Sequence, residues 1–166
     1  MARLILVGLP GVGKTTVAHS VAQRWECPVL DTDDVLSEEA GCAAPEFLRR
    51  EGETRFRDRE LEALRTALAC DAVVATGGGI VSSEAARTLL GSQVTIWLDC
   101  TDDVILARVG DGDRPLLGED PTTAVVRLRL ARQHLYREVS RARVDASGTL
   151  EDVVQRVIDA AGRVAS

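Results

Sequence analysis

The sequence predicts a three-layer α/β/α protein built on a five-stranded parallel sheet. Short apolar segments without polar alternation, typical of strands buried on both faces, alternate with longer segments of helical periodicity. This alternation indicates parallel strands with helices covering both faces of the sheet. A length of 166 residues with 45% hydrophobic and 28% charged residues suits one soluble core. We therefore expect a single domain over residues 1–166.

The elements follow in order along the chain. Strands are expected at 3–8, 28–31, 71–76, 94–98 and 142–146, and the main helices at 16–25, 57–69, 83–90, 102–108, 122–141 and 150–164. Ser83 is the expected N-cap of its helix. Residues 34–60 are polar, break near 41–45 and at 52, and predict an inserted pair of helices beside the core. Residues 110–121 contain three glycines, two prolines and five charges, which predicts a mobile loop.

Composition excludes several classes of protein. The formal charge of −6 argues against broad electrostatic binding of nucleic acid. The longest apolar runs are about five residues, far below the roughly 20 needed to cross a membrane. Four cysteines without C-x-x-C spacing disfavour a zinc site or a disulfide framework and predict buried or half-buried thiols. With no leader pattern expected at the start, we predict a cytoplasmic protein without a membrane or nucleic-acid partner.

The clearest motif is a phosphate-binding loop. The segment from Gly8 to Thr15 fits G-x-x-x-x-G-K-[ST], with a predicted strand before it and a helix after it. Its backbone amides would cradle phosphate oxygens, Lys14 would reach the β/γ-phosphates, and the Thr15 hydroxyl would sit on Mg²⁺. Nineteen of the twenty basic residues are arginine, so the only lysine marks a place that needs a compact ammonium. Because Lys14 is the only lysine, the guanine-reading motif of GTPase switches, [NT]-K-x-D, is absent.

Other polar groups fall where the strands are expected to end. Asp31 and Asp33 would leave one face of an extended segment, where paired carboxylates can hold hydrated Mg²⁺ or accept a hydroxyl proton. The alternative is that they cap the next helix. Arg57 and Glu60 are spaced for an ion pair that fixes a guanidinium for carboxylate capture, or for an ordinary solvated helix face. The glycines at 77–79 predict either a ligand contact or a simple turn. A binding role or ordinary solvent exposure stays open for Arg114 and for the stripe of Arg129, Arg132 and Tyr136.

Taken together, these residues resemble the shikimate kinases. The motifs occur in that family's order: Leu30-Asp-Thr-Asp33, Gly52-Glu…Phe56-Arg57-x-x-Glu60, Gly77-Gly-Gly79, Arg114-Pro-Leu-Leu117 and Arg132-x-x-x-Tyr136. The resemblance covers residues 4–154. It implies ATP-dependent phosphorylation of the shikimate 3-hydroxyl, with Mg²⁺, in the pathway to chorismate and aromatic amino acids.

The resemblance also implies roles for individual residues. Asp33 would bind the attacking hydroxyl as the candidate base, with Lys14 and the lid residue Arg114 acting on the transferred phosphate. The acceptor would be held by Asp33, Arg57, Gly78, Gly79 and Arg132. The nucleotide would be held by Gly11, Val12, Gly13, Lys14, Thr15, Thr16, Arg108 and Arg114. Mg²⁺ would be held by Thr15 directly and by Asp31 through water. Residues 34–60 would be the substrate-binding helices, 110–121 the lid, and 147–150 would flank the adenine with Arg108.

Two alternatives of different kind remain at this stage. A P-loop kinase for another small hydroxy acid, such as a sugar acid or another cyclitol acid, would keep Lys14, Thr15 and Arg114 but need other residues at Arg57 and Arg132. An amino analogue of shikimate also stays open as the acceptor. A nucleotide-binding regulatory protein without turnover would have no use for the acceptor-side carboxylate of Asp33. We expect a monomer.

Overall fold

The computed structural model describes residues 1–109 and 120–164. Its five strands are β1 (Leu4–Val7), β2 (Val29–Asp31), β3 (Val73–Ala75), β4 (Thr95–Asp99) and β5 (Ala142–Asp145). They form one parallel sheet in the order β2-β3-β1-β4-β5. The predicted fold class is confirmed, and each predicted strand falls within two residues of an observed one.

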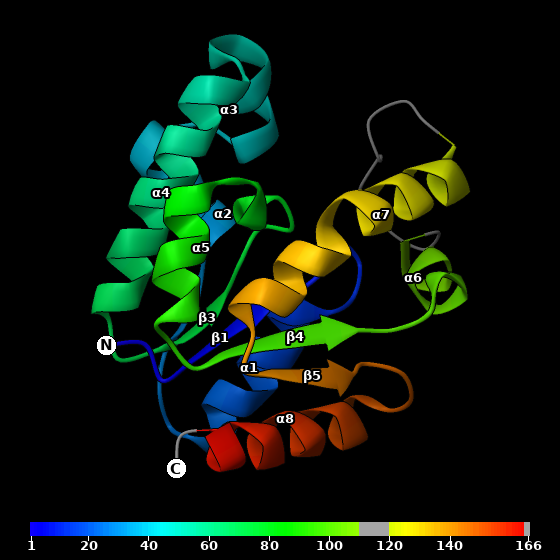
Figure 1. Ribbon diagram of the computed structural model, residues 1–166. Helices are drawn as coiled ribbons and strands as arrows, with labels where there is room; N and C mark the ends of the chain where they lie inside the picture. Colours follow the sequence, from blue (N-terminus) through cyan, green and yellow to red (C-terminus); the bar gives the residue numbers. More distant parts are fainter. Residues whose placement is uncertain (110–119, 165–166) are drawn as a thin grey trace.

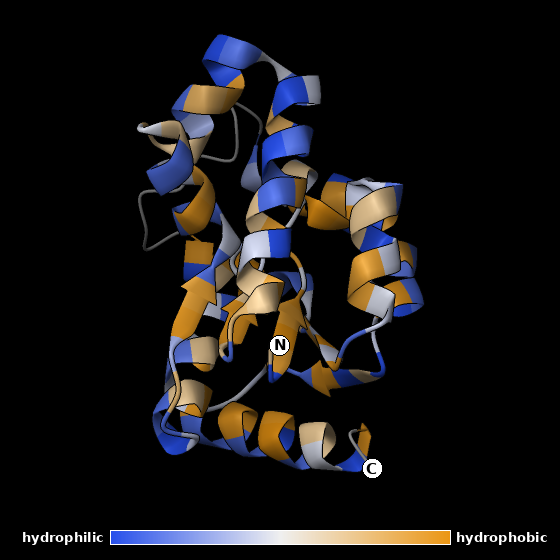
Figure 2. Ribbon diagram, turned by 90° about the vertical axis from the view of Figure 1, so that its left-hand side faces the viewer, coloured by the Kyte–Doolittle hydropathy of each residue, from blue (hydrophilic) through white to orange (hydrophobic). Residues whose placement is uncertain are grey.

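Helices cover both faces of the sheet (Figure 1). The helices α1 (Lys14–Arg24) and α8 (Leu150–Val164) lie side by side on one face. On the other face lie α4 (Glu53–Ala69), α5 (Glu84–Gly91) and α7 (Pro121–Val139), with α6 (Asp102–Val109) beside α7 and a short 3₁₀ turn, η1 (Ile80–Ser82), ahead of α5. Figure 2 shows the sheet to be mostly hydrophobic, while the helices carry both hydrophobic and hydrophilic residues. The core is therefore the sheet and the helix faces against it.

A second, smaller cluster of apolar side chains lies away from the sheet. The predicted helical insertion consists of α2 (Thr32–Ala40), α3 (Ala44–Glu51) and the first turns of α4. Its helices share the buried residues Leu36, Ala44, Phe47, Phe56 and Ala63. The helix expected from residue 57 begins earlier, at Glu53, because Gly52 serves as the boundary of both α3 and α4. Packing in this second cluster holds the start of α4 near the ligand edge of the sheet.

Smaller predictions have mixed outcomes. Ser83 caps α5, its hydroxyl accepting from the Ala86 amide. All four cysteines are free, but Cys70 is exposed rather than buried or half-buried. No helix in the described ranges is long and apolar enough to cross a membrane. The predicted lid falls almost wholly outside the described residues, and Arg114 with it.

Candidate active site

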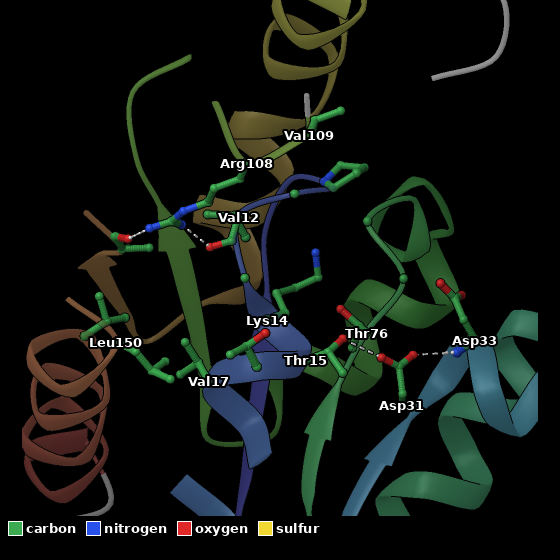
Figure 3. A pocket seen from close by; sticks show the side chains of 18 of the residues that line it. Val12, Lys14, Thr15, Val17, Asp31, Asp33, Thr76, Arg108, Val109 and Leu150 are labelled. Atoms are coloured by element: carbon green, nitrogen blue, oxygen red, sulfur yellow. Dashed lines mark hydrogen bonds between the residues drawn. The ribbon is translucent and has the colours of Figure 1, made fainter. Parts of the chain in front are cut away.

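The carboxyl ends of all five strands meet at one edge of the sheet, where parallel α/β folds bind their ligands. There they open into a cleft of about 750 Å³ (Figure 3). One end is lined by the P-loop, the acids after β2 and the glycines after β3, and the other by Arg108 and the segment after β5. Of the predicted site residues, the cleft wall includes Gly11, Val12, Gly13, Lys14, Thr15, Thr16, Asp31, Asp33, Gly78 and Arg108.

The P-loop connects β1 to α1, as its sequence predicts. Gly11 and Gly13 have φ of 83° and 101°, values that side chains rarely tolerate, so glycine is required to turn the loop. Lys14 is only 8% exposed, and its Nζ donates to the carbonyls of Gly8 at 2.8 Å and Leu9 at 3.0 Å. The ammonium is thus held beneath the loop, at the N-terminus of α1, where anions bind.

Asp31 links the P-loop to the start of α2. Its Oδ2 accepts from the Thr15 hydroxyl at 2.8 Å, and its Oδ1 accepts from the Asp33 amide at 3.0 Å (Figure 3). A hydroxyl and a carboxylate in contact form a hard oxygen donor pair, the type that Mg²⁺ prefers. The residues present therefore fit the ion that the sequence predicts at this place.

The two acids do not share one extended segment, so that sequence argument is wrong. The strand ends at Asp31, which is the N-cap of α2, while Asp33 lies in the first turn of the helix. The capping alternative is therefore true of Asp31, and it coexists with the Thr15 contact. The helical turn nevertheless brings the Asp33 carboxylate close to the glycine loop: a Cβ added at Gly77 would lie 2.6 Å from Asp33 Oδ1.

The three glycines after β3 are explained by close approach from three directions. A Cβ on Gly77 would meet Asp33, one on Gly78 would lie 2.8 Å from the Pro10 ring, and one on Gly79 would lie 2.6 Å from Arg57 Nη1. The loop thus brings the P-loop, α2 and α4 together. The sequence predicted a ligand contact or a turn here, and the additional requirement is packing against three neighbours.

Arg57 is fixed as predicted. Its Nη1 donates to Glu60 Oε2 at 2.5 Å within α4, and its Nη2 lies 3.5 Å from Glu53. Glu60 is 3% exposed. Burial raises the pKa of Glu60, while the Arg57 guanidinium, and more weakly that of Arg132, opposes the shift. Asp33, Arg57 and Arg132 thus all act on the pKa of this one buried carboxyl group, although neither arginine lines the cleft itself.

The stripe predicted on α7 divides into different roles. Arg129 turns toward the sheet, where Nη1 donates to buried Asp99 at 2.8 Å and Nε to Asp102 at 2.6 Å. Tyr136 is fully buried rather than part of a polar face. Arg132 is half-buried and faces the Glu60 and Tyr136 side chains. Only Arg132 of the three is therefore disposed to meet a ligand.

At the other end of the cleft, Arg108 joins the P-loop to the segment after β5. It donates from Nη1 to the Val12 carbonyl at 2.8 Å and from Nη2 to the Ala146 carbonyl at 2.7 Å (Figure 3). Gly148 and Leu150 line the same end, and Leu150 is 44% exposed. Arg108 and Leu150 both line this end of the cleft, where a planar base would meet a guanidinium and an aliphatic side chain.

Several contacts were not anticipated from the sequence. The Thr32 hydroxyl accepts from the Gly77 amide at 3.0 Å, and the Tyr136 hydroxyl donates to the Gly78 carbonyl at 2.6 Å. Thr32 stands between Asp31 and Asp33, so its position in the motif was the available signal. The Tyr136 contact spans 58 residues, and no local pattern encodes it.

Known proteins match this chain over nearly its whole length. A sequence model of the shikimate kinase family matches residues 10–161. The chain is 41% identical over 161 residues to shikimate kinase from Streptomyces avermitilis, covering 95% of this chain and 94% of the relative. It is 32% identical over 163 residues to that of Enterococcus faecalis, covering 95% and 97%. The solved structure of shikimate kinase from Acinetobacter baumannii in complex with shikimate superposes with a TM-score of 0.87 at 32% identity, covering 94% and 90%.

Proposed function

Because the chain belongs to the shikimate kinase family, we propose that its cleft transfers the γ-phosphoryl group of ATP to the 3-hydroxyl of shikimate. The products are shikimate 3-phosphate and ADP. The observation that carries this assignment is the acceptor end of the cleft. A carboxylate (Asp33), a fixed guanidinium (Arg57) and bare glycine amides gather within reach of the P-loop. These groups match a hydroxyl, a carboxylate and further hydroxyls of one small anionic polyol.

On the nucleotide side, the P-loop amides and Lys14 would hold the phosphates. Shikimate kinases use ATP with Mg²⁺, and here the Thr15 hydroxyl would hold the ion directly and Asp31 through water. The ion supplies charge neutralisation on the β/γ-phosphates when bound. The bond between Thr15 and Asp31 orients both oxygens before any ligand arrives. Arg108 and Leu150 would enclose the adenine.

On the acceptor side, Arg57 and Arg132 would clamp the carboxylate of shikimate, and the Gly78 and Gly79 amides would donate to another of its oxygens. Asp33 would accept the proton of the attacking hydroxyl. Phosphoryl transfer needs little covalent chemistry from the protein, so most of the rate enhancement comes from positioning and from charge at the transferred group. Arg114, outside the described residues, would add its positive charge there as the lid arginine.

We also propose that the protein acts as a monomer in the cytoplasm. All groups assigned above come from one chain, so no second copy is needed to complete the site. Free thiols at all four cysteines agree with a reducing compartment. Residues 34–60 would be the substrate-binding helices of this single domain and residues 110–121 its lid.

The activity is tested by ADP release with Mg·ATP and shikimate, gluconate, quinate or no acceptor. Turnover confined to shikimate is expected. ATP binding without turnover on any acceptor would instead indicate the regulatory alternative, and turnover on another acid would indicate a different kinase.

Arg132→Ala tests the acceptor clamp. Loss of a charge-assisted contact of about 1.5–3 kcal/mol would raise the KM for shikimate roughly 10- to 150-fold. The Kd for ATP in a binary titration should stay unchanged. Arg137→Ala, an exposed arginine on the same helix, is the matched control and should alter neither constant. An equal loss of ATP affinity in Arg132→Ala would refute the clamp.

A further inference from the structure

Among the described residues, four of the six backbone polar groups of the glycine loop after β3 have hydrogen-bond partners. The three carbonyls of the loop accept, in order, from the Ile80 amide at 3.2 Å, the Tyr136 hydroxyl at 2.6 Å and the Ser82 amide at 3.0 Å. The Gly77 amide donates to Thr32. Within residues 1–109 and 120–164, the two amides of Gly78 and Gly79 have no acceptor. The loop therefore offers two donors to an acceptor substrate.

Of the three carbonyl contacts, only that of Gly78 comes from a distant element. The Ile80 and Ser82 bonds are local turns of η1, which the chain forms on its own. Tyr136 comes from α7, 58 residues later. It is fully buried, with its ring stacked on Trp97 of β4 at a centroid distance of 6.1 Å. The hydroxyl is thus delivered by packing against the sheet, independently of the loop.

The hydroxyl also stays a donor throughout the working pH range. Burial raises the pKa of Tyr136 to about 12, although the nearby Arg132 guanidinium opposes the shift. Arg132 precedes Tyr136 by about one turn on α7, so the same helix presents the candidate clamp arginine and the tyrosine. The same helix therefore fixes the position of the Arg132 guanidinium and that of the Gly78 carbonyl.

The peptide bond between Gly78 and Gly79 connects this contact to the substrate. Because a trans peptide is planar, the Gly78 carbonyl and the Gly79 N–H point in opposite directions. With glycine on both sides, this plane can rotate at little steric cost. An anchored carbonyl fixes the direction of the Gly79 donor, and rotation of the plane would turn the carbonyl oxygen toward the acceptor.

We propose that Tyr136 is a positioning residue for acceptor binding, because its hydroxyl holds the Gly78–Gly79 peptide with the N–H turned to the substrate. The inference rests on the proposed function, since it takes the acceptor to be bound at this loop. Tyr136 itself touches no substrate atom in this scheme. Its contribution is to prevent the loop from sampling an orientation that cannot bind.

Tyr136→Phe tests the proposal, because it keeps the ring on Trp97 and removes only the hydroxyl. We expect the Kd for shikimate, measured by calorimetry, and the KM to rise roughly tenfold, the factor set by about 1.4 kcal/mol. The kcat at saturating shikimate should stay within about twofold, because the lost interaction serves binding of ground state and transition state alike. The Kd for ATP should not change.

Thr95→Val is the matched control. Thr95 is likewise fully buried and donates its hydroxyl to a backbone carbonyl, that of Leu90, at 2.7 Å. It lies at the first residue of β4, the end of the strand away from the ligand edge. Both variants should lower the melting temperature comparably, while only Tyr136→Phe weakens shikimate binding.

Two results would overturn the inference alone: an unchanged Kd for shikimate in Tyr136→Phe, or an equal rise in Thr95→Val, which would show a general loss of stability. If the wild-type protein neither binds nor phosphorylates shikimate, the proposed function fails first and this inference with it. The two failures are thereby distinguished before any variant is compared.

Discussion

Gly79→Ala is a substitution that should leave the fold intact and disable the acceptor clamp. Gly79 has φ −89° and ψ −4°, a turn conformation outside the positive-φ region, so alanine can adopt it without the strain of a left-handed backbone. The new Cβ would, however, lie 2.6 Å from Arg57 Nη1 and 3.0 Å from Nη2. To reach an ordinary contact of about 3.4 Å, the guanidinium must retreat by roughly 0.8 Å.

The size of the effect follows from that displacement. The guanidinium is the far end of a long side chain, so it can retreat without moving the backbone, although its ion pair with Glu60 must adjust. The same retreat moves the cation that would pair with the shikimate carboxylate, and misplacement of about 1 Å in a binding group can cost on the order of 100-fold. We expect the kcat/KM for shikimate to fall between about 10- and 100-fold, with the Kd for ATP unchanged.

A double-mutant cycle identifies the route of the effect. If alanine at position 79 acts by moving Arg57, adding Gly79→Ala to Arg57→Ala should cost almost nothing further, a strong non-additivity expected only of residues in contact. Gly91→Ala, where a Cβ would meet nothing within 4 Å, controls for adding a methyl group. Additive losses in kcat/KM would refute the reasoning.

Two further predictions concern the charges that support the site. In the described part of the chain, two arginines pair with Asp99, which is 4% exposed; Arg129→Met removes one and leaves Arg143, a side chain that is 62% exposed. Urea unfolding should show a loss of about 2–3 kcal/mol, below the 3–5 of a fully buried pair because Arg129 is 20% exposed. An unchanged unfolding midpoint would show that the pair contributes nothing. Because burial raises the pKa of Glu60 above 4.5, its contribution to stability is fully present below the unfolded-state pKa and is lost as the pH rises through the folded-state pKa. Glu60→Gln cannot ionise, so its free energy of unfolding relative to wild type should rise between pH 4 and pH 7, and a flat or falling difference would contradict the assigned shift.

The elements that sequence predicts best are those whose signal is local. The strands β1 and β3 are apolar along their whole length, and the P-loop has a distinctive glycine and lysine spacing, so all three are found from neighbouring residues alone. The last strand, β5, contains Arg143 and Asp145 and has a weaker local signal. The start of α4 is harder to predict, because Gly52 ends one helix and begins the next and residues 53–55 are exposed polar residues that add nothing to the apolar periodicity. Element type is therefore more predictable than element boundary.

Contacts between distant segments explain what the sequence left open. Asp31 and Asp33 were placed on one extended segment because alternation in a strand is the simplest model of an i, i+2 pair, but a helix begins between them. Arg129 and Arg132 look alike on α7, and only the position of Asp99 on β4 shows that the first is occupied structurally. The Tyr136 hydroxyl donates to the Gly78 carbonyl, and no sequence pattern on α7 predicts this contact.

The composition gives one last connection between sequence and site. Nineteen arginines and a single lysine show that a guanidinium serves at every other cationic position. Lys14 is 8% exposed, and its ammonium donates to two carbonyls of the P-loop itself. An arginine there would bring five N–H donors on a rigid planar fork to a buried place beneath a tight loop. Five donors fixed in one plane cannot all point at two carbonyls of a tight loop and at a phosphate, and a buried donor without an acceptor costs about 1–3 kcal/mol. A compact ammonium with three donors matches the same acceptors, which explains physically why the chain keeps lysine at this position.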